Sequence, residues 1–318
     1  MRILLLGSTG TIGASTLRAL IAKGHAVTCI VRTAHPDSPM PTGVAWVYAD
    51  PCQPNAWPDR LFNGEPFDAL ISCMASRTGH PKDAWAVDHD AHLAILNTVK
   101  AAGIGHFILL SAICVQKPQL AFQKAKRAFE SALIASGLNY SIVRPTAFFK
   151  SLSGQLERVR RGHPFLVFGD GQLTACKPIS DDDLADFIAG CLTDVLRHRA
   201  VLPIGGPGPA ITPLDQAEAI FAHLGQPLRI KRVPIRLLDS IIWLLTTAGR
   251  VIPAAAAKGE LAKIGRYYAT ESMLVWDATQ ERYDSDKTPS HGKETLFDAY
   301  ARWLDGETLP KRGDHAVF

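Results

Sequence analysis

The sequence lacks an apolar run long enough to cross a membrane. Its longest apolar stretch, residues 237–252, contains Asp239 and Arg250, whereas a membrane-spanning helix needs about 20 predominantly apolar residues. We interpret this stretch as a helix that is either buried in the core or placed at an interface, with peripheral membrane contact as an alternative role. The apolar residues 1–6 are too few for a secretory signal, which predicts a cytoplasmic protein.

Closely spaced cysteines are also missing. The six cysteines are Cys29, Cys52, Cys73, Cys114, Cys176 and Cys191. Their spacings match neither zinc nor iron–sulfur motifs, and several lie inside apolar runs, where cysteine packs as a small hydrophobic side chain. The sequence therefore predicts reduced thiols, no metal site and no iron–sulfur electron source.

The sequence has no concentrated block of basic residues. It contains 34 Lys and Arg against 30 Asp and Glu, a net charge of +4, and we interpret the basic residues as dispersed. Because nucleic-acid binding needs a clustered basic surface, we expect no nucleic-acid partner and favour a small anionic molecule. The sequence leaves the oligomeric state open.

Short apolar runs alternate with helical patterns through the first half of the chain. The runs predict strands at residues 2–6, 26–32, 44–50, 67–75, 107–112 and 140–144, and helices at 14–23, 91–102 and 121–136. Apolar strands that alternate with helices are typical of a parallel sheet covered on both faces. We therefore predict an α/β fold with a Rossmann-type doubly wound sheet in residues 1–150. A smaller substrate-binding portion is expected at 151–305, with elements that return to the main sheet, and a flexible tail at 306–318.

A glycine-rich turn, Gly7-Ser-Thr-Gly10-Thr-Ile-Gly13, connects the first predicted strand to the first predicted helix. This is the context that a dinucleotide-binding motif requires. Gly7 permits the tight turn, Gly10 lets the backbone approach a pyrophosphate, and Gly13 allows the helix to pack closely on the strand. The helix N-terminus adds N–H groups for the phosphates. The turn therefore predicts a nicotinamide-dinucleotide site.

The end of the second predicted strand selects the cofactor. An acidic residue there would bind the ribose 2′-hydroxyl of NAD, but this chain has Arg32-Thr33, which suits the 2′-phosphate of NADPH. Asp50, at the end of the third strand, is placed for the adenine amino group. The residues predicted to bind the cofactor are Gly7, Ser8, Thr9, Gly10, Thr11, Ile12, Gly13, Arg32, Thr33, Asp50, Ala75, Ser111, Lys126 and Pro145.

The Gly-x-x-Gly-x-x-Gly spacing resembles that of the extended and atypical short-chain dehydrogenases. Carbonyl reductases of that superfamily use Tyr-x-x-x-Lys, with the tyrosine as acid and the lysine on the nicotinamide ribose. The matching segment here is Phe122-Gln-Lys-Ala-Lys126, which keeps the lysine and lacks the acid. Since phenylalanine cannot donate a proton, we do not expect alcohol–ketone chemistry.

Later blocks resemble the NADPH-dependent divinyl chlorophyllide 8-vinyl-reductases, an NmrA-like family of atypical short-chain dehydrogenases. The blocks are Ser111-Ala-Ile-Cys-Val-Gln-Lys-Pro118, Val143-Arg-Pro-Thr-Ala-Phe-Phe-Lys-Ser151, Phe168-Gly-Asp-Gly171, Cys176-Lys-Pro-Ile-Ser180, Pro203-Ile-Gly-Gly-Pro207 and Lys263-Ile-Gly-Arg-Tyr-Tyr-Ala269. With the glycine turn they extend over nearly the whole chain. The resemblance implies that one vinyl group of a (bacterio)chlorophyll precursor is reduced to ethyl. It places the protein in the cytoplasm of a phototrophic bacterium or at the periphery of its photosynthetic membrane.

A large, flat tetrapyrrole with a propionate group would need apolar walls and a cation. The predicted substrate contacts are Phe122, Phe148, Phe149, Lys177, Tyr267 and Tyr268, and the predicted catalytic residues are Lys126 and Lys150. Two other functions stay open, a reductase of phenylpropanoid-like alkenes and a regulatory sensor that binds NADP without turnover. The preferred pigment precursor and the proton donor also stay open.

Overall fold

The computed structural model describes residues 1–32, 43–77 and 80–310, which form two compact units. Unit 1 comprises Met1–Ser76, Pro81–Pro145 and Asp181–Pro203, and unit 2 comprises Arg77–His80, Thr146–Ser180 and Ile204–Phe318. The chain therefore leaves unit 1 after residue 145 and returns to it for one further segment. Thr33 and residues 311–318 of the predicted tail lie outside the described residues.

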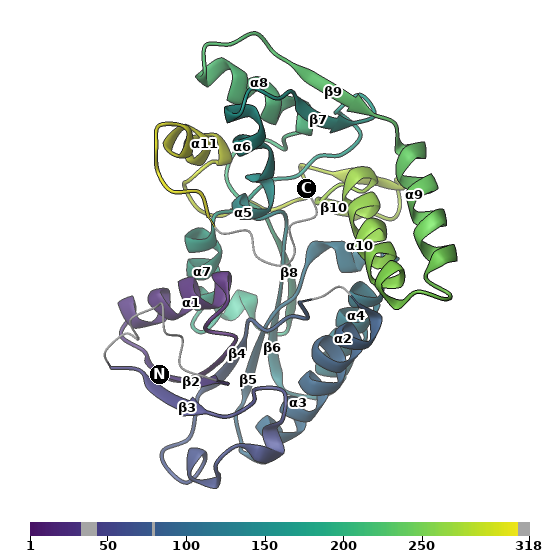
Figure 1. Cartoon of the computed structure of the whole chain (residues 1–318). Coiled ribbons are helices and arrows are strands. Elements are labelled where there is room, and N and C mark those ends of the chain that lie inside the picture. Colours follow the sequence, from purple (N-terminus) through teal and green to yellow (C-terminus); the bar gives the residue numbers. More distant parts are fainter. Residues whose placement is uncertain (33–42, 78–79, 311–318) are drawn as a thin grey trace. The chain divides into compact units, whose positions relative to one another are not determined.

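Unit 1 is built on a seven-stranded sheet (Figure 1). Its strands are β1 (Arg2–Leu6), β2 (Ala26–Val31), β3 (Ala45–Tyr48), β4 (Ala69–Ser72), β5 (His106–Leu110), β6 (Asn139–Pro145) and β8 (Ala200–Ile204). Their order is β3-β2-β1-β4-β5-β6-β8, and every pair from β3 to β6 is parallel. The order reverses between β1 and β4, and dinucleotides bind at such a switch point. The prediction of a Rossmann-type sheet is confirmed.

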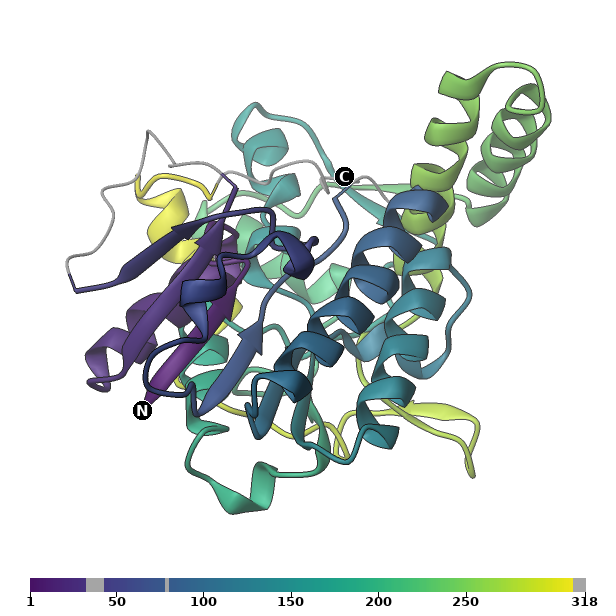
Figure 2. The same ribbon diagram turned by 90° about the horizontal axis from the view of Figure 1, so that it is seen from below.

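Helices cover both faces of this sheet (Figures 1 and 2). They are α1 (Thr11–Ala22), α2 (Pro81–Trp85), a π-helical turn (Ala86–Ala91), α3 (His92–Ala101), α4 (Ala121–Ala135) and α7 (Asp181–Gly190). α1 packs with α7 on one face, and α3 packs with α4 on the other. Side chains of β1, β4 and β5 form a buried core with α3 and α4, which includes Leu4, Leu70, Phe107, Ile95 and Phe129.

The helix predicted at residues 91–102 begins ten residues earlier, at Pro81. Proline is favoured in the first position of a helix because its missing N–H would have no intrahelical partner there. The π-helical turn at Ala86–Ala91 adds one residue to the turn and so shifts the apolar periodicity. This shift explains why the sequence pattern revealed only the last part of the helix.

Unit 2 is built from shorter elements. They are α5 (Phe149–Leu152), α6 (Gly154–Arg160), β7 (Phe165–Phe168), α8 (Pro213–His223), β9 (Ile230–Val233), α9 (Ile235–Ala248), α10 (Pro253–Thr270), β10 (Val275–Asp277), β11 (Arg282–Asp284) and α11 (Leu296–Leu304). β7 pairs with β9 in parallel, and β10 pairs with β11 antiparallel. Capping boxes begin α8 at Thr212 and α11 at Thr295. The buried Tyr300 hydroxyl of α11 lies 3.0 Å from Gln216 Oε1 of α8, which joins the two helices.

The apolar stretch at residues 237–252 is not buried. α9 covers most of it, and none of the 14 residues of α9 is buried. The expectation of a core-packing helix was therefore wrong, and the interfacial alternative stays a prediction. Within the described ranges, no helix is long and apolar enough to cross a membrane.

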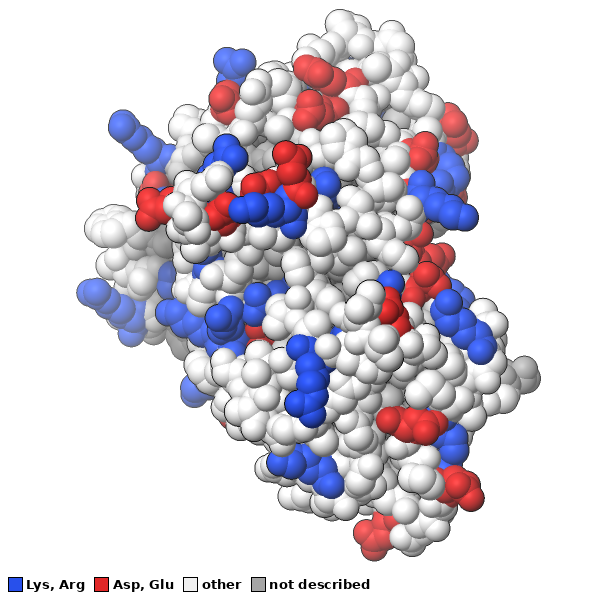
Figure 3. Space-filling model, turned by 180° about the vertical axis from the view of Figure 1, so that it is seen from behind, with Lys and Arg blue, Asp and Glu red and all other residues white. Residues whose placement is uncertain are grey.

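Acidic and basic side chains are interspersed over the face of the molecule in Figure 3. Exposed ion pairs also join α1 to α7, between Arg18 and Asp182 at 2.8 Å and between Lys23 and Asp186 at 2.8 Å. Exposed pairs of this kind contribute about 0–1 kcal/mol each. They add little to stability, and the packing of α1 on α7 and the sheet depends on apolar burial instead.

Candidate active site

The glycine turn between β1 and α1 has the shape that a pyrophosphate needs. Gly7 has a φ of +78°, a conformation that L side chains rarely adopt, and its carbonyl accepts a hydrogen bond of 3.0 Å from the Gly10 N–H. A Cβ on Gly7 would lie 2.8 Å from the backbone of Cys73, and a Cβ on Gly13 would lie 1.9 Å from the Gly7 carbonyl oxygen. The glycines therefore let β1, β4 and α1 converge on one point.

The first turn of α1 presents backbone donors to that point. Its N-cap residue, Gly10, makes no side-chain cap, and the first turn contains no acidic residue. Backbone N–H groups and the positive end of the helix dipole favour an anion there. The side chain of Ile12 is buried, so its backbone is the part available to a phosphate. This geometry fits the diphosphate of a nicotinamide dinucleotide.

The hydroxyl side chains of the turn do not all face the same way. Thr9 and Thr11 are exposed and stay predicted phosphate donors. The Ser8 side chain is buried, and its Oγ has no hydrogen-bond partner among the described residues. Burial raises the pKa of the Cys29 thiol of β2 to about 11, so this thiol is protonated at neutral pH.

The residues predicted to hold the adenosine half lie at the ends of β2, β3 and β4. Arg32 is exposed directly after β2, and Ala75 is exposed after β4. Asp50 is half-buried after β3, where its Oδ1 accepts a hydrogen bond of 3.0 Å from the Cys52 N–H. The carboxylate is thus held at the strand end, and its contact with the adenine amino group stays a prediction.

The loop after β4 turns most of its side chains inward. The Cys73 thiol lies 3.8 Å from the Thr16 hydroxyl of α1, and burial raises the pKa of Cys73 to about 12, so this thiol is protonated at neutral pH. Met74 belongs to the core, and Ser76 is buried. Ala75 is exposed and stays a predicted cofactor contact.

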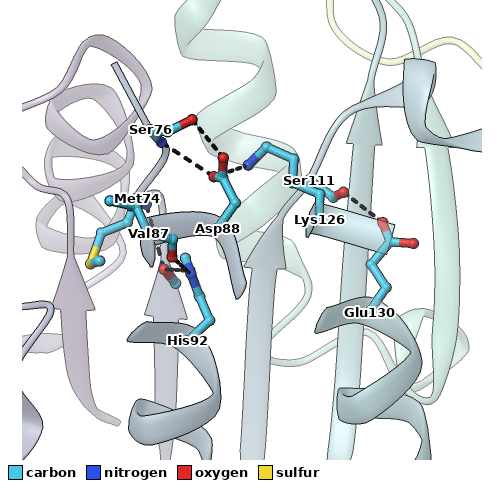
Figure 4. Close-up of polar contacts among 9 residues, drawn as sticks. Met74, Ser76, Val87, Asp88, His92, Ser111, Lys126 and Glu130 are labelled. Atoms are coloured by element: carbon cyan, nitrogen blue, oxygen red, sulfur yellow. Dashed lines mark hydrogen bonds and ion pairs between the residues drawn. The ribbon is translucent and has the colours of Figure 1, made fainter. Parts of the chain in front are cut away.

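Lys126 forms a buried ion pair at the end of the loop (Figure 4). Its Nζ lies 2.9 Å from Asp88 Oδ1, and the two side chains are 11% and 0% exposed. Asp88 also accepts hydrogen bonds from the Ser76 hydroxyl at 2.6 Å and from the Ser76 N–H at 3.2 Å. An ammonium group has three donors, and Asp88 accepts one of them. Asp88 thus fixes Lys126 of α4 and the β4 loop in one arrangement.

His92 forms hydrogen bonds with the end of β4 and with the π-helical turn. Its Nδ1 lies 2.7 Å from the Val87 carbonyl oxygen and its Nε2 lies 2.9 Å from the Ser72 hydroxyl. Burial lowers the pKa of His92 to about 4, and the nearby Lys126 ammonium acts in the same direction. His92 is therefore neutral at physiological pH, with Nδ1 donating to the carbonyl and Nε2 accepting from Ser72. This neutral ring ties the π-helical turn to β4.

Ser111, at the end of β5, is held by a second buried network. Its hydroxyl donates to Glu130 Oε1 at 2.5 Å (Figure 4), and Arg144 at the end of β6 donates to the same oxygen at 3.0 Å and to Glu130 Oε2. Glu130 is 1% exposed, so Arg144 compensates a charge that water cannot reach. Because Ser111 has a single proton and gives it to Glu130, its hydroxyl can accept a hydrogen bond but not donate one.

One face of α4 carries three residues of the candidate site at four-residue intervals. They are Phe122, Lys126 and Glu130. The helix begins at Ala121, and the buried Gln123 side chain fixes its first turn by accepting hydrogen bonds from the N–H groups of Gln119 and Leu120 at 2.7 and 2.9 Å. Phe122 is half-buried one turn before Lys126. The segment matched to Tyr-x-x-x-Lys thus lies on a helix with the spacing that motif requires.

Asp88, Glu130, Arg144 and His92 also belong to this site, although the sequence did not predict them. Glu130 had a sequence signal, because it follows Lys126 by four residues and so shares its helix face. Asp88 and His92 had none, since their side-chain partners Lys126 and Ser72 are distant in the sequence and the π-helical turn obscures their periodicity. Pro145 is buried at the end of β6 and stays a predicted cofactor contact.

The remaining predicted residues belong to unit 2. Phe149 is buried, while Phe148 and Lys150 are half-buried at the start of α5. Lys177 donates to the Thr288 carbonyl at 3.0 Å and lies 3.3 Å from the Ser290 hydroxyl. Their contacts with a substrate stay predictions.

The two tyrosines predicted to bind substrate lie together near the end of α10. Tyr267 is 3% exposed and Tyr268 is 39% exposed, with their rings in an edge-to-face contact at 5.7 Å. Their contact with substrate stays a prediction as well. Among the described residues, no group of three or more His, Cys, Asp or Glu side chains could hold a metal ion.

Known proteins are similar to this chain in sequence and in fold. A family model described as NAD(P)H-binding matches residues 7–195. The chain is 43% identical to divinyl chlorophyllide a 8-vinyl-reductase, chloroplastic, of Oryza sativa subsp. indica, over 99% of this chain and 82% of the rice protein. The protein of the same name from Cucumis sativus is 44% identical, over 99% of this chain and 79% of the cucumber protein.

A solved structure supports the fold assignment. The leucoanthocyanidin reductase–NADPH complex of Vitis vinifera matches with a TM-score of 0.67 and 14% identity, over 96% of this chain and 100% of that chain. At this identity the likeness shows a shared fold and nothing about the substrate.

Proposed function

This chain belongs to the family of the divinyl chlorophyllide a 8-vinyl-reductases, and from this membership we propose that it reduces the 8-vinyl group of a divinyl chlorophyllide or protochlorophyllide to an ethyl group. The chain is an oxidoreductase with a nicotinamide dinucleotide as cofactor, and its substrate is a small-molecule tetrapyrrole of chlorophyll biosynthesis. The observation that carries the proposal is identity above 40% over nearly the whole chain. The six cysteines are free thiols, in keeping with the proposed cytoplasmic location.

NADPH, when bound, supplies a hydride. We propose that the glycine turn at residues 7–13 binds its diphosphate and that Arg32 binds its 2′-phosphate. Lys126 binds the nicotinamide ribose, and Asp88 holds the Lys126 ammonium in place through the 2.9 Å ion pair. Lys150 of unit 2 is the proposed cation for charge that develops on the macrocycle.

The two hydroxyl donors of a carbonyl reductase are absent from this site. Phe122 occupies the tyrosine position, and the Ser111 hydroxyl donates its proton to Glu130. A carbonyl substrate would need a donor for the oxygen that becomes negative in the transition state, whereas an alkene has no such oxygen. This arrangement supports reduction of a carbon–carbon double bond.

A substrate panel separates the three candidate functions. NADPH consumption should be measured with divinyl chlorophyllide, with a phenylpropanoid-like alkene and with no substrate. We expect consumption with the pigment and an ethyl product in stoichiometric amount. Consumption with the phenolic alkene alone would identify the second reductase class, and cofactor binding without any consumption would identify a sensor.

The position of the added proton follows from the electronics of the vinyl group. Addition of hydride to the terminal carbon leaves negative charge on the carbon attached to the macrocycle, where conjugation delocalises it. Addition to the inner carbon would leave the charge on a primary carbon without such stabilisation. We therefore expect reduction in heavy water with ordinary NADPH to place deuterium in the methylene of the new ethyl group. Deuterium in the methyl group, read by mass spectrometry or NMR, would contradict this mechanism.

Arg32→Ala should weaken NADPH binding by about 10- to 100-fold, because it removes a charge-assisted interaction of about 1.5–3 kcal/mol. NADH affinity should stay unchanged, since NADH has no 2′-phosphate. Calorimetric titration of both cofactors measures the difference. Arg18→Ala is the matched control, because its guanidinium already binds Asp182 and Ser15 at 2.8 Å. Equal losses for NADPH and NADH would assign Arg32 a structural role.

A further inference from the structure

In the helical pair α9–α10 of unit 2, α9 has an apolar side that α10 does not cover. One stripe of α9, formed by Leu238, Ile242 and Leu245, is half-buried. A Cβ on Gly259 of α10 would lie 3.6 Å from the Leu245 Cβ, so α10 packs closely against this stripe. The helices are held further by an ion pair between Asp239 and Arg266. Figure 1 shows α9 and α10 side by side.

A second apolar stripe of α9 is exposed. Leu237, Ile241 and Leu244 follow one another at intervals of four and three residues and lie on one face of the helix. Leu244 is 61% exposed, and Trp243 beside it is 69% exposed. A helix of a globular protein normally buries such a stripe against its core. Here none of the residues of α9 is buried.

The turn between the helices extends this apolar surface. Val251 is 85% exposed and Ile252 is 53% exposed. Gly249 allows the turn to close tightly, because a Cβ there would lie 2.8 Å from the Cα of Ala256. The exposed residues Val251 and Ile252 therefore lie in a turn that is close-packed against the start of α10.

The segment that contains the end of β9, α9 and most of α10 carries the positive excess of the chain. Residues 231–268 include seven basic residues and two acidic residues, Asp239 and Glu260. The whole chain has 34 basic and 30 acidic residues, so its other parts have 27 basic and 28 acidic residues. Its net charge of +4 thus arises from this segment.

Both acidic residues of the segment are paired within it. Asp239 binds Arg266, and Glu260 binds Lys263 at 2.7 Å. The other basic residues of the segment flank the exposed stripe in sequence. They are Lys231, Arg232, Arg236, Arg250 and Lys258.

We propose that α9 and the turn at residues 249–252 dock onto the surface of an anionic lipid bilayer. An exposed apolar stripe flanked by basic residues and a tryptophan has the chemistry of a helix that lies in the membrane interface. The 14 residues of α9 have a length of about 21 Å, less than the ~30 Å hydrocarbon core, so the helix lies in the plane of the interface. A two-fold contact between copies would bring the same basic residues together, which favours lipid over a second copy.

Docking would bring the protein to the phase in which an apolar macrocycle accumulates. This benefit of docking rests on the proposed function, whereas the charge and exposure of α9–α10 do not depend on it. A test with lipid alone therefore distinguishes failure of the docking proposal from failure of the proposed reaction.

Flotation of the full chain with vesicles tests the proposal. We expect binding to vesicles of phosphatidylcholine with phosphatidylglycerol, and much weaker binding to phosphatidylcholine alone. Trp243→Ser with Leu244→Ser should lower partitioning by about 100-fold or more. Arg236→Gln with Arg250→Gln should lower it by about 30-fold at low salt. All four side chains are exposed, so folding should be unaffected.

Matched pairs elsewhere in the chain serve as controls. Val195→Ser with Leu196→Ser changes an exposed apolar pair of unit 1, and Arg160→Gln with Arg161→Gln changes an exposed basic pair of unit 2. Both control variants should bind the anionic vesicles like the original chain. The proposal is overturned if the original chain fails to float, or if the Trp243 and Leu244 variant floats equally well. It is also overturned if sedimentation shows a dimer that this variant abolishes while vesicles are not bound.

Discussion

Replacing Lys126 with methionine is expected to lower kcat/KM for the alkene by about 100- to 1,000-fold, because the ammonium that we propose orients the cofactor is lost. Methionine keeps most of the length and the apolar stem of the side chain. The fully buried Asp88 carboxylate loses its cation, and breaking one side of a buried ion pair costs about 3–5 kcal/mol. Steady-state kinetics and urea unfolding measure the two effects separately.

The double variant Asp88→Asn with Lys126→Met separates catalysis from stability. It removes the uncompensated charge, so most of the lost free energy of unfolding should return while the activity stays low. Lys124→Met changes an exposed lysine of the same helix and should alter neither quantity. If activity returned together with stability in the double variant, Lys126 would have a structural role alone.

Alanine at Gly13 should abolish cofactor binding and destabilise the fold, whereas alanine at Gly10 should affect binding alone. A Cβ on Gly13 would lie 1.9 Å from the Gly7 carbonyl oxygen, but a Cβ on Gly10 would lie 3.4 Å from it, close to ordinary van der Waals contact. Gly13→Ala must therefore displace α1 or the turn, and a shift of about 1 Å in a binding site costs on the order of 100-fold. Gly10→Ala should cost about 1 kcal/mol or less in stability.

Titration with NADPH and urea unfolding test this pair of variants. Gly10→Ala should weaken binding strongly because its methyl group occupies the space that the diphosphate approaches. Gly64→Ala is the control, since a Cβ there would have no atom within 4 Å. Unchanged NADPH affinity in Gly10→Ala would move the diphosphate away from this turn.

The glycine turn and the apolar strands could be predicted from the sequence because their causes are local. Gly7, Gly10 and Gly13 lie within seven consecutive residues, and a Cβ on Gly7 or Gly13 would collide with backbone atoms. The strands β1, β4 and β5 are predominantly apolar because helices cover both of their faces. The segment Phe122-x-x-x-Lys126 could also be predicted from the local sequence, because its spacing places both residues on one helix face.

Only the tertiary structure decided how the polar side chains pair. Lys126 meets Asp88, which is 38 positions away in the sequence, because α4 packs beside the π-helical turn. Ser111 loses its donor role because α4 brings Glu130 to it and β6 places Arg144 on the same carboxylate. Local patterns do not encode such pairings, since each depends on how separate elements pack.

The apolar stretch at 237–252 also shows which properties follow from the sequence and which follow from the tertiary structure. The sequence by itself determined that α9 is apolar, too short to span a bilayer and flanked by Arg236 and Arg250. Burial depends on whether other elements cover a helix, and periodicity cannot supply that information. The tertiary structure placed α10 against one stripe of α9 and left Leu237, Ile241 and Leu244 exposed.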